Sequence, residues 1–178
     1  FFYVPLNYYS ATLIAARLGC VLPTPRIVDA IYDQSIHRLK PAPLPAGPLM
    51  GTNLYMAEHK QRVDAQRRGF APGGLIAGHK KDLVLTNRLA QMPGRVAIYG
   101  WHLATGRPIQ PLSLVHGARY VDYSHGLRLV ASVVDIGGVE RSIYDALEDS
   151  TLASALTREG VTPNAWGLMH PQPPANRA

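Results

Sequence analysis

The sequence contains very little cysteine: Cys20 is the only one among 178 residues. A single thiol cannot form an internal disulfide, and there are no paired cysteines for a thiolate zinc site or an iron–sulfur cluster. The chain also lacks a run of about 18 consecutive apolar residues, the length that a membrane-spanning helix requires. A disulfide scaffold and a transmembrane helix are therefore excluded as explanations of the fold.

Charged residues are scarce as well, at 17% of the chain against 47% hydrophobic residues. This balance supplies enough apolar surface to offset the entropy lost on folding, and it excludes global disorder. The length predicts a single domain over residues 1–178. Lys and Arg outnumber Asp and Glu by 18 to 12, and this excess favours an anionic partner such as a cell-wall glycan or peptide.

Several nucleotide and nucleic-acid motifs are missing. The sequence has no Walker loop, no GxGxxG, no zinc finger and no RNP-type segment. It therefore predicts neither a nucleotide cofactor nor specific recognition of nucleic acid.

Start and stop signals predict three helices in the first part of the chain. Ser10 is the expected N-cap of the first helix and Gly19 its expected end. Thr24 followed by Pro25 predicts the start of the second. The three predicted helices span residues 10–18, 25–40 and 53–68. Between the second and third, residues 41–48 contain four prolines and predict an extended strap over the surface.

From Gly73 onward the hydrophobic pattern changes to short β-type runs with Gly and Pro between them. The predicted strands are residues 1–4, 75–77, 83–86, 96–101, 112–115 and 127–134. Ser142 begins a capping box for a short helix, residues 150–159 predict another, and residues 163–178 predict an extended tail. The order predicts an α+β fold, with a small, mostly antiparallel sheet flanked by N-terminal and C-terminal helices.

Four histidines in the β-rich part lie within two residues of a glycine, near predicted strand ends: His79, His102, His116 and His125. Imidazole titrates near neutral pH and serves as base, acid or metal ligand, while glycine leaves room for a substrate to approach. Taken singly, each of these histidines could equally have a structural hydrogen-bonding role.

The segment Tyr123-Ser-His-Gly-Leu-Arg-Leu129 resembles the Ser-His-Gly-Cys-x-Arg motif of YkuD-type L,D-transpeptidases. That resemblance implies a histidine base and an arginine that binds substrate or oxyanion. In this chain Leu127 stands where the family has its nucleophilic cysteine, and Leu129 stands where it has the arginine. An aliphatic side chain cannot form an acyl intermediate, so an active transpeptidase is not expected.

Longer segments resemble a group of uncharacterised, apparently exported bacterial proteins. These segments are GHKKDLV at residues 78–84, VAIYGWH at 96–102 and YSHGLRLV at 123–130. The resemblance implies an extracellular or periplasmic location. A chain that begins at Phe1 without a methionine fits the same expectation.

Together these features predict a secreted or envelope-associated hydrolase or acyl-transfer enzyme with a histidine-centred site. His125 is the expected base and His102 its partner or a second acid. Arg128 and Ser124 are expected to orient the substrate or to stabilise developing negative charge.

Substrate-binding residues are predicted around these groups. Trp101 and Tyr123 could stack against sugar rings or bases. Lys81 could bind an anionic substrate, and Asp122 is an alternative partner for His125.

Two other classes of function fit the sequence. In a zinc-dependent hydrolase, His79, His102, His116 and His125 would converge on a metal ion with one position open for water. No tight ligand spacing such as HExxH supports it, and zinc is the one cofactor considered. In a non-catalytic envelope-binding or structural protein, the histidines would instead be buried far from one another.

Overall fold

The computed structural model describes residues 3–71 and 73–172. Its helices are α1 (Tyr8–Arg17), α2 (Pro25–Gln34), the 3-10 helix η1 (Pro48–Gly51), α3 (Asn53–Arg67), α4 (Arg88–Gln91), α5 (Ile143–Glu148), α6 (Ala153–Leu156) and α7 (Ala165–Met169). Its strands are β1 (Cys20–Val21), β2 (His37–Arg38), β3 (Ile76–Ala77), β4 (Lys81–Leu83), β5 (Ile98–His102), β6 (Pro108–Ser113), β7 (His125–Gly126), β8 (Val130–Ala131), β9 (Val133–Ile136) and β10 (Val139–Ser142).

The strands form one four-stranded sheet and three two-stranded pairs. The larger sheet has the order β6-β5-β4-β7, with antiparallel pairing except between β4 and β7, which are parallel. The pairs β1–β8 and β9–β10 are antiparallel, and β2–β3 is parallel. The predicted α+β class with small, mostly antiparallel sheets is confirmed.

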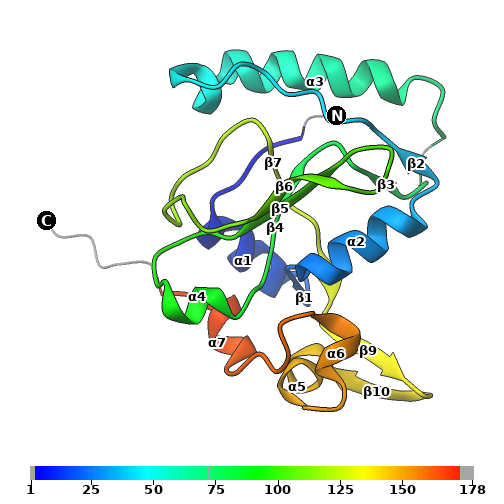
Figure 1. Cartoon of the computed structure of the whole chain (residues 1–178), viewed down its shortest axis with the longest axis vertical. Helices are drawn as coiled ribbons and strands as arrows, with labels where there is room; N and C mark the ends of the chain where they lie inside the picture. Colours follow the sequence, from blue (N-terminus) through cyan, green and yellow to red (C-terminus); the bar gives the residue numbers. More distant parts are fainter. Residues whose placement is uncertain (1–2, 72, 173–178) are drawn as a thin grey trace, which may run out of the picture.

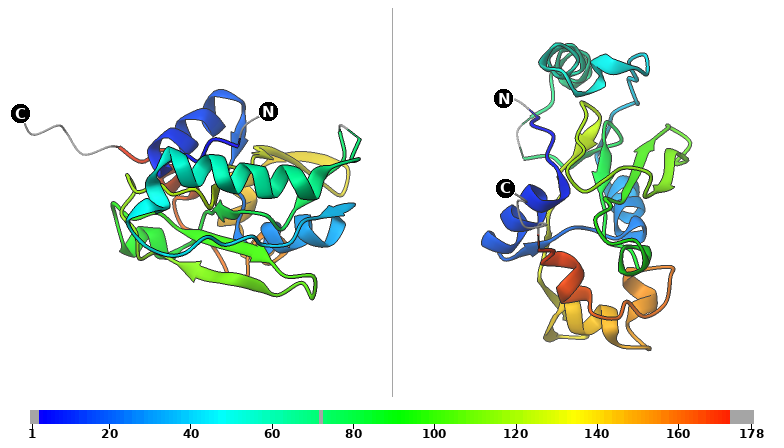
Figure 2. Two further views of the ribbon diagram at one scale, coloured as in Figure 1. Left: turned by 90° about the horizontal axis from the view of Figure 1, so that it is seen from above. Right: turned by 90° about the vertical axis from the view of Figure 1, so that its left-hand side faces the viewer.

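Figure 1 shows the four-stranded sheet in the middle of the molecule, with α3 along one end. The β9–β10 hairpin and helices α5 and α6 form the opposite end, as the side view in Figure 2 also shows. Among the helices that the structure describes, none is long and apolar enough to cross a membrane.

The helix caps account for much of the N-terminal half. The Thr24 side chain accepts a hydrogen bond from the Ile27 amide, with Pro25 at the first helical position, as predicted for α2. That helix ends earlier than predicted, at Gln34, because the chain turns extended at Ser35 and residues 37–38 pair with β3. The first helix begins before Ser10, because Asn7 rather than Ser10 is its cap.

Residues 41–47 have no regular secondary structure and are held from two sides. The hydroxyl of Tyr123 accepts a hydrogen bond from the Leu44 amide at 2.7 Å. On α3, the Gln66 side chain accepts from the Lys40 amide at 2.8 Å and donates to the Lys40 carbonyl at 3.1 Å. The strap is therefore fixed between α3 and the loop that carries Tyr123.

Three strand and tail predictions differ from the structure. The predicted strand 127–134 is interrupted: residues 127–129 are not in a strand, and the rest is divided between β8 and β9, which belong to two different sheets. The predicted tail from residue 163 contains helix α7, because Ala165 and Met169 are buried in the main core; residues 173–178 lie outside the described part. Tyr3 and Val4 are not in a strand, and Phe1 and Phe2 are not described.

Buried apolar residues form two clusters. The main one joins α1, α2, α5 and α7 to β4 and β5. The second is small and consists of Leu44, Tyr55, Trp101 and Tyr123. It fastens α3 and the strap to the sheet, next to the predicted histidine site.

Candidate functional site

A cavity of about 510 Å³ lies where the end of α3, the segment before β4, and β7 meet. Its volume is within the range of small-molecule sites. Three of the candidate residues from the sequence, His79, His125 and Arg128, line it. The polar side chains in its wall are Tyr3, Arg67, His79, Lys80, Asp82, His125 and Arg128.

Positive charge dominates this wall. Arg67, Lys80 and Arg128 face one carboxylate, Asp82. The Nε atom of Arg128 lies 3.3 Å from an oxygen of Asp82, and Nη2 donates to the carbonyl of Ile76 at 2.9 Å. Burial raises the pKa of Asp82, although Arg128 opposes this shift. The wall therefore favours an anionic ligand over a cation.

Gly126 on β7 allows the side chains of Lys80 and Asp82 to pack against the backbone of β7. β4 and β7 pair so that Asp82 lies opposite Gly126. A Cβ atom on Gly126 would be 2.8 Å from Cβ of Lys80 and 3.1 Å from an oxygen of Asp82. The absence of a side chain at this position brings Lys80, Asp82 and Arg128 to one part of the cavity.

His125 presents an uncharged imidazole. The residue is 1% exposed, and neither ring nitrogen has a hydrogen-bond partner among the described residues. Its Nε2 atom is 4.0 Å from an oxygen of Asp122. Burial lowers the pKa of His125 to about 4, although the negative charge of Asp122 opposes the shift. At neutral pH the ring is therefore in its uncharged form.

Asp122 is held in place by its neighbours in sequence. One of its oxygens accepts from the Ser124 amide at 2.7 Å and from the Ser124 hydroxyl at 2.5 Å. The other accepts from the hydroxyl of Tyr120 at 3.1 Å. Burial acts to raise the pKa of Asp122, but the His125 ring and the hydrogen bonds from Ser124 outweigh it, so the pKa is lowered. A carboxylate next to His125 is thus maintained.

Ser124 has a different position from the one predicted. It is fully buried and donates its hydroxyl to Asp122, and it does not line the cavity. A hydroxyl committed in this way cannot reach a developing oxyanion. Ser124 acts on the site through Asp122.

His79 is a second neutral imidazole in the cavity wall. Its ring lies 4.9 Å from the ring of Tyr3. Burial, followed by the charges of Arg128 and Lys80, lowers the pKa of His79 to about 3. The two histidines of the cavity therefore add no charge of their own at neutral pH.

One histidine near the site was missed by the sequence analysis. His59 on α3 is fully buried, and neither ring nitrogen has a hydrogen-bond partner within the described ranges. Its ring lies 5.1 Å from that of Tyr123 and 6.2 Å from that of Trp101. Burial, then the charge of Lys80, lowers its pKa to about 3. The available signal was its spacing, four residues from both Tyr55 and Val63 on an otherwise polar helix.

The two aromatic residues predicted to bind substrate are core residues instead. Trp101 is 4% exposed and Tyr123 is 1% exposed, and neither lines the cavity. Positive φ angles at Gly100 and Trp101 interrupt the regular course of β5, which changes the alternation of side chains. Lys81 also lies outside the cavity wall, with its ammonium 5.1 Å above the Trp101 ring.

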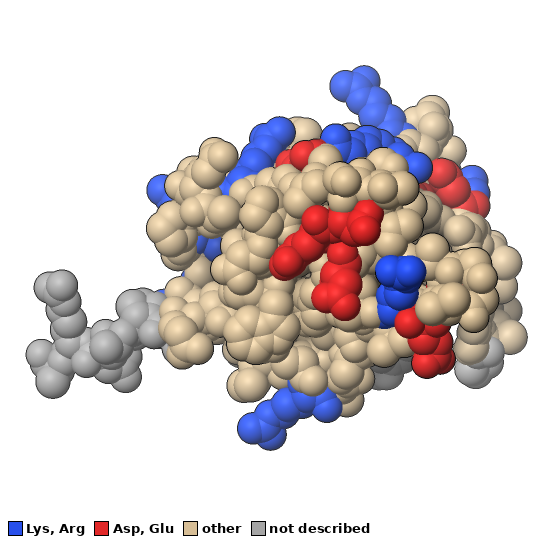
Figure 3. Space-filling model, turned by 90° about the horizontal axis from the view of Figure 1, so that it is seen from below, with Lys and Arg blue, Asp and Glu red and all other residues tan. Residues whose placement is uncertain are grey.

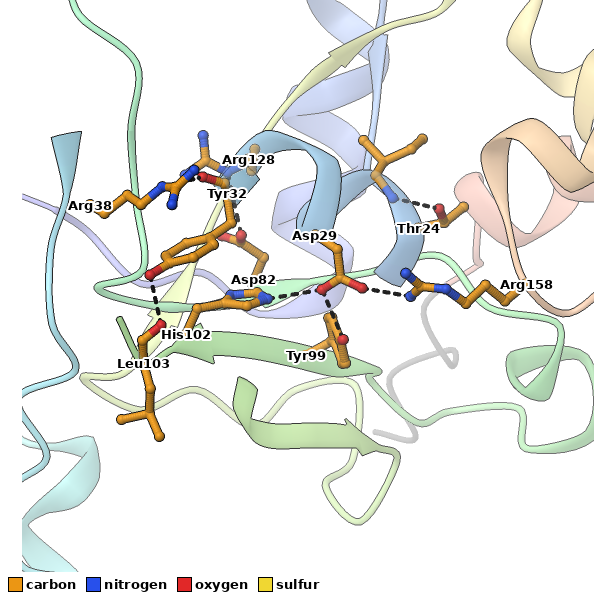
Figure 4. Close-up of polar contacts among 11 residues, drawn as sticks. Thr24, Asp29, Tyr32, Arg38, Asp82, Tyr99, His102, Leu103, Arg128 and Arg158 are labelled. Atoms are coloured by element: carbon orange, nitrogen blue, oxygen red, sulfur yellow. Dashed lines mark hydrogen bonds and ion pairs between the residues drawn. The ribbon is translucent and has the colours of Figure 1, made fainter. Parts of the chain in front are cut away.

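His102 belongs to a separate polar cluster between β5 and α2, drawn in Figure 4. Its Nε2 lies 2.9 Å from an oxygen of Asp29, which also accepts from the hydroxyl of Tyr99 at 2.9 Å. The second oxygen of Asp29 is 2.5 Å from Arg158. The ring of His102 stacks on Tyr32 at 4.6 Å. The predicted pairing of His102 with His125 is therefore not formed, because Asp29 binds His102 at the other side of β5.

The Asp29 cluster gives a stability prediction. We expect Asp29→Asn to lower the free energy of unfolding by about 1–2 kcal/mol, because the hydrogen bonds to Arg158, His102 and Tyr99 lose their charged acceptor. Urea denaturation at neutral pH measures the change. Asp33→Asn on the same helix is the control, since the Asp33 side chain has no hydrogen bond or ion pair in the described part of the chain. Equal stability of the two variants would contradict a stabilising role for the cluster.

The zinc site considered from the sequence is not formed by its four histidines. His102 is bound to Asp29, and His116 stacks on Tyr120 at 3.9 Å with its ring 6.5 Å from that of His125. Over residues 3–71 and 73–172, no group of three or more His, Cys, Asp or Glu side chains is placed to hold a metal ion.

The surface charge is unevenly distributed. Figure 3 shows the end of the molecule opposite α3, where Asp and Glu side chains gather near the centre of the view. The cavity lies toward the other end and takes Arg67 from the end of α3. An anionic ligand is therefore attracted toward the cavity end of the molecule.

Searches against protein-family models, curated proteins and solved structures found no match for the chain. The chemistry of the site therefore follows from its own geometry. Leu127 also lies in the cavity wall. The wall thus combines cationic side chains, the uncharged His125 and the aliphatic side chain of Leu127.

Proposed function

We propose that the protein is a hydrolase that cleaves an amide or ester bond in an anionic substrate, with His125 as the general base. One observation carries this proposal: an uncharged His125, with both ring nitrogens free of hydrogen bonds in the described structure, lines a cavity that also contains Arg128. A neutral imidazole can take a proton, and an arginine can bind a carboxylate or phosphate with two N–H groups.

In the proposed reaction, His125 accepts a proton from a water molecule as the water oxygen attacks the substrate carbonyl. The resulting imidazolium is stabilised by the Asp122 carboxylate, 4.0 Å away. It then returns the proton to the leaving nitrogen or oxygen as the bond breaks. Arg128 holds the anionic group of the substrate, because its Nη1 has no partner among the described residues while Nε and Nη2 keep it in place.

The arrangement favours transfer to water over formation of an acyl-enzyme. Leu127 has no nucleophilic atom, and the Ser124 hydroxyl is bound to Asp122 outside the cavity. Of the two predicted reaction types, hydrolysis is therefore the one supported.

Anionic peptides and glycans of the cell envelope fit this substrate class, and an extracellular or periplasmic location belongs to the same proposal. Support comes from the net charge of +6 and from the cationic cavity wall. The proposed substrate class and the proposed location both depend on the sequence resemblances and on this charge.

The test is a hydrolysis assay on a panel of carboxylated and phosphorylated esters and amides, including peptidoglycan fragments. We expect His125→Gln to lower the rate of the best substrate by about 100-fold or more, because glutamine cannot accept the proton. His170→Gln is the matched control, since His170 lies near α7 outside the cavity wall. A His125→Gln variant that folds and hydrolyses that substrate at the parental rate would contradict the proposal.

A second candidate is a non-catalytic protein that binds an anionic envelope component. The replacement of the motif's nucleophile by Leu127 favours it, because the cation-lined cavity persists without that group. In this case Arg128→Gln would abolish binding of peptidoglycan fragments, and the parent would hydrolyse no member of the panel.

A further inference from the structure

Besides the proposed hydrolysis, we propose that Lys80 is a reactive amine that forms an imine with the carbonyl carbon of a small oxo acid bound in the cavity. The inference concerns a side chain to which the hydrolytic mechanism assigns no role. It requires the cavity and the cationic groups around it, and it does not require hydrolysis.

Lys80 differs from the other lysines of the chain, which are Lys40, Lys60 and Lys81. It is 8% exposed and lines the cavity. Its neighbour Lys81 is directed toward the Trp101 ring, and Lys60 forms an ion pair with Asp64 on α3. Lys80 is therefore the lysine placed to meet a small molecule inside the protein.

The surroundings of Lys80 increase the fraction of its amine that is uncharged, although the ammonium form still predominates at neutral pH. Its Nζ donates to the carbonyl of Tyr123 at 2.5 Å, and no carboxylate within the described ranges is hydrogen-bonded to it. Burial lowers the pKa of Lys80 to about 8, although the charge of Asp122 opposes the shift. Free amine, the form that attacks a carbonyl, is thus more abundant here than on a solvated lysine.

Water in the cavity is the proton acceptor for the reaction. Lys81, not Lys80, pairs with His125, and the Lys80 side chain lies on the face of Gly126, so Lys80 and His125 are directed to opposite faces of the sheet. A cavity of about 510 Å³ has room for water molecules, which can take up the proton released when an amine adds to a carbonyl.

The Nζ lone pair attacks the carbonyl carbon and forms a C–N bond as the C=O π bond breaks. A proton passes from nitrogen through water to the carbonyl oxygen, which becomes the hydroxyl of a carbinolamine. The hydroxyl then takes a second proton from solvent and leaves as water, while the nitrogen lone pair forms the C=N bond. The protonated imine retains one N–H, which can still donate to the Tyr123 carbonyl. No oxidant or reductant is consumed.

Arg128 sets the class of ligand. Packing around Gly126 brings Lys80 and Asp82 together, and Asp82 is 3.3 Å from Arg128. Lys80 and Arg128 line the same cavity, and a molecule with a carbonyl next to a carboxylate has one group for the amine and one for the guanidinium. An α-oxo acid has this arrangement of groups.

The test uses glyoxylate with cyanoborohydride, which reduces an imine to a stable secondary amine, followed by peptide mapping by mass spectrometry. In the folded parent protein we expect one carboxymethyl group at Lys80, added at least about tenfold faster than at Lys40 or Lys60. Labelling that is equal at the three lysines, or absent from Lys80, would overturn the proposal.

Two controls sharpen this result. Lys80→Arg should remove the fast labelling at position 80 and leave the slow labelling of Lys40 and Lys60 unchanged. Circular dichroism checks that this variant is folded. Labelling of the parent in urea should abolish the preference for Lys80, because the lowered pKa depends on burial. Loss of hydrolysis in the panel assay does not affect this covalent readout, so the two proposals can fail separately.

Discussion

Between about pH 7.5 and pH 5 we expect the protein to lose about 6 kcal/mol of its free energy of unfolding, because three buried histidines are uncharged in the folded state. Burial lowers the pKa of His59 and His79 to about 3 and that of His125 to about 4, from an ordinary value of 6.5. The unfolded chain therefore binds more protons than the folded chain in this window. Stability is fully present above about pH 7.5 and falls as the pH approaches 4, with each histidine contributing about 2 kcal/mol by pH 5.

Urea denaturation at a series of pH values measures this effect. A loss of this size is comparable with the whole free energy of unfolding of many domains, so we expect the protein to be close to unfolding at pH 5. His59→Leu is the informative variant, because His59 packs against Trp101 and Tyr123 and leucine cannot titrate. The variant should lose about one third less stability over the same window. A parent protein equally stable at pH 7 and pH 5 would show that the three rings are charged or exposed.

The second large effect is expected at Gly78, the residue that leads into His79 and Lys80. We expect Gly78→Ala to lower the free energy of unfolding by about 3 kcal/mol or more. The residue has φ +95°, which disfavours a side chain. A Cβ there would also lie 2.3 Å from the carbonyl oxygen of Leu39, which belongs to the backbone and cannot move aside freely.

A second glycine separates these two causes. Gly94 has φ +77°, but a Cβ at that position would have no heavy atom within 4 Å. Gly94→Ala should therefore show the backbone strain alone, about 1–2 kcal/mol. Thermal or urea denaturation of both variants compares them directly. Equal, small losses would contradict the close approach of Gly78 to the Leu39 carbonyl.

Local signals predicted the starts of α2 and α5 well. Thr24 with Pro25, and Ser142 before the short helix α5, are caps that act within one turn, so the sequence is sufficient to place them. Strand limits were predicted less well. β7 and β8 contain two residues each and pair with strands distant in the chain, so no local periodicity marks where one ends and the next begins.

In the candidate site, too, the features set by local sequence were predictable and those set by pairing of distant segments were not. His125 and Arg128 were found because a short sequence motif contains both. Their contacts were not predictable, since Asp82 and Lys80 reach them through the parallel pairing of β4 with β7. His102 was wrongly paired because the irregular backbone at Gly100 and Trp101 interrupts the regular alternation along β5.

The most direct test of a neutral base in the cavity is an NMR titration of the imidazole of His125 in the free, folded protein. We expect the ring to remain uncharged down to about pH 5, with its midpoint near the pKa of about 4 that burial produces. A midpoint close to 6.5 would show an ordinary, solvated histidine. It would contradict both the proposed base and the contribution of this ring to acid sensitivity.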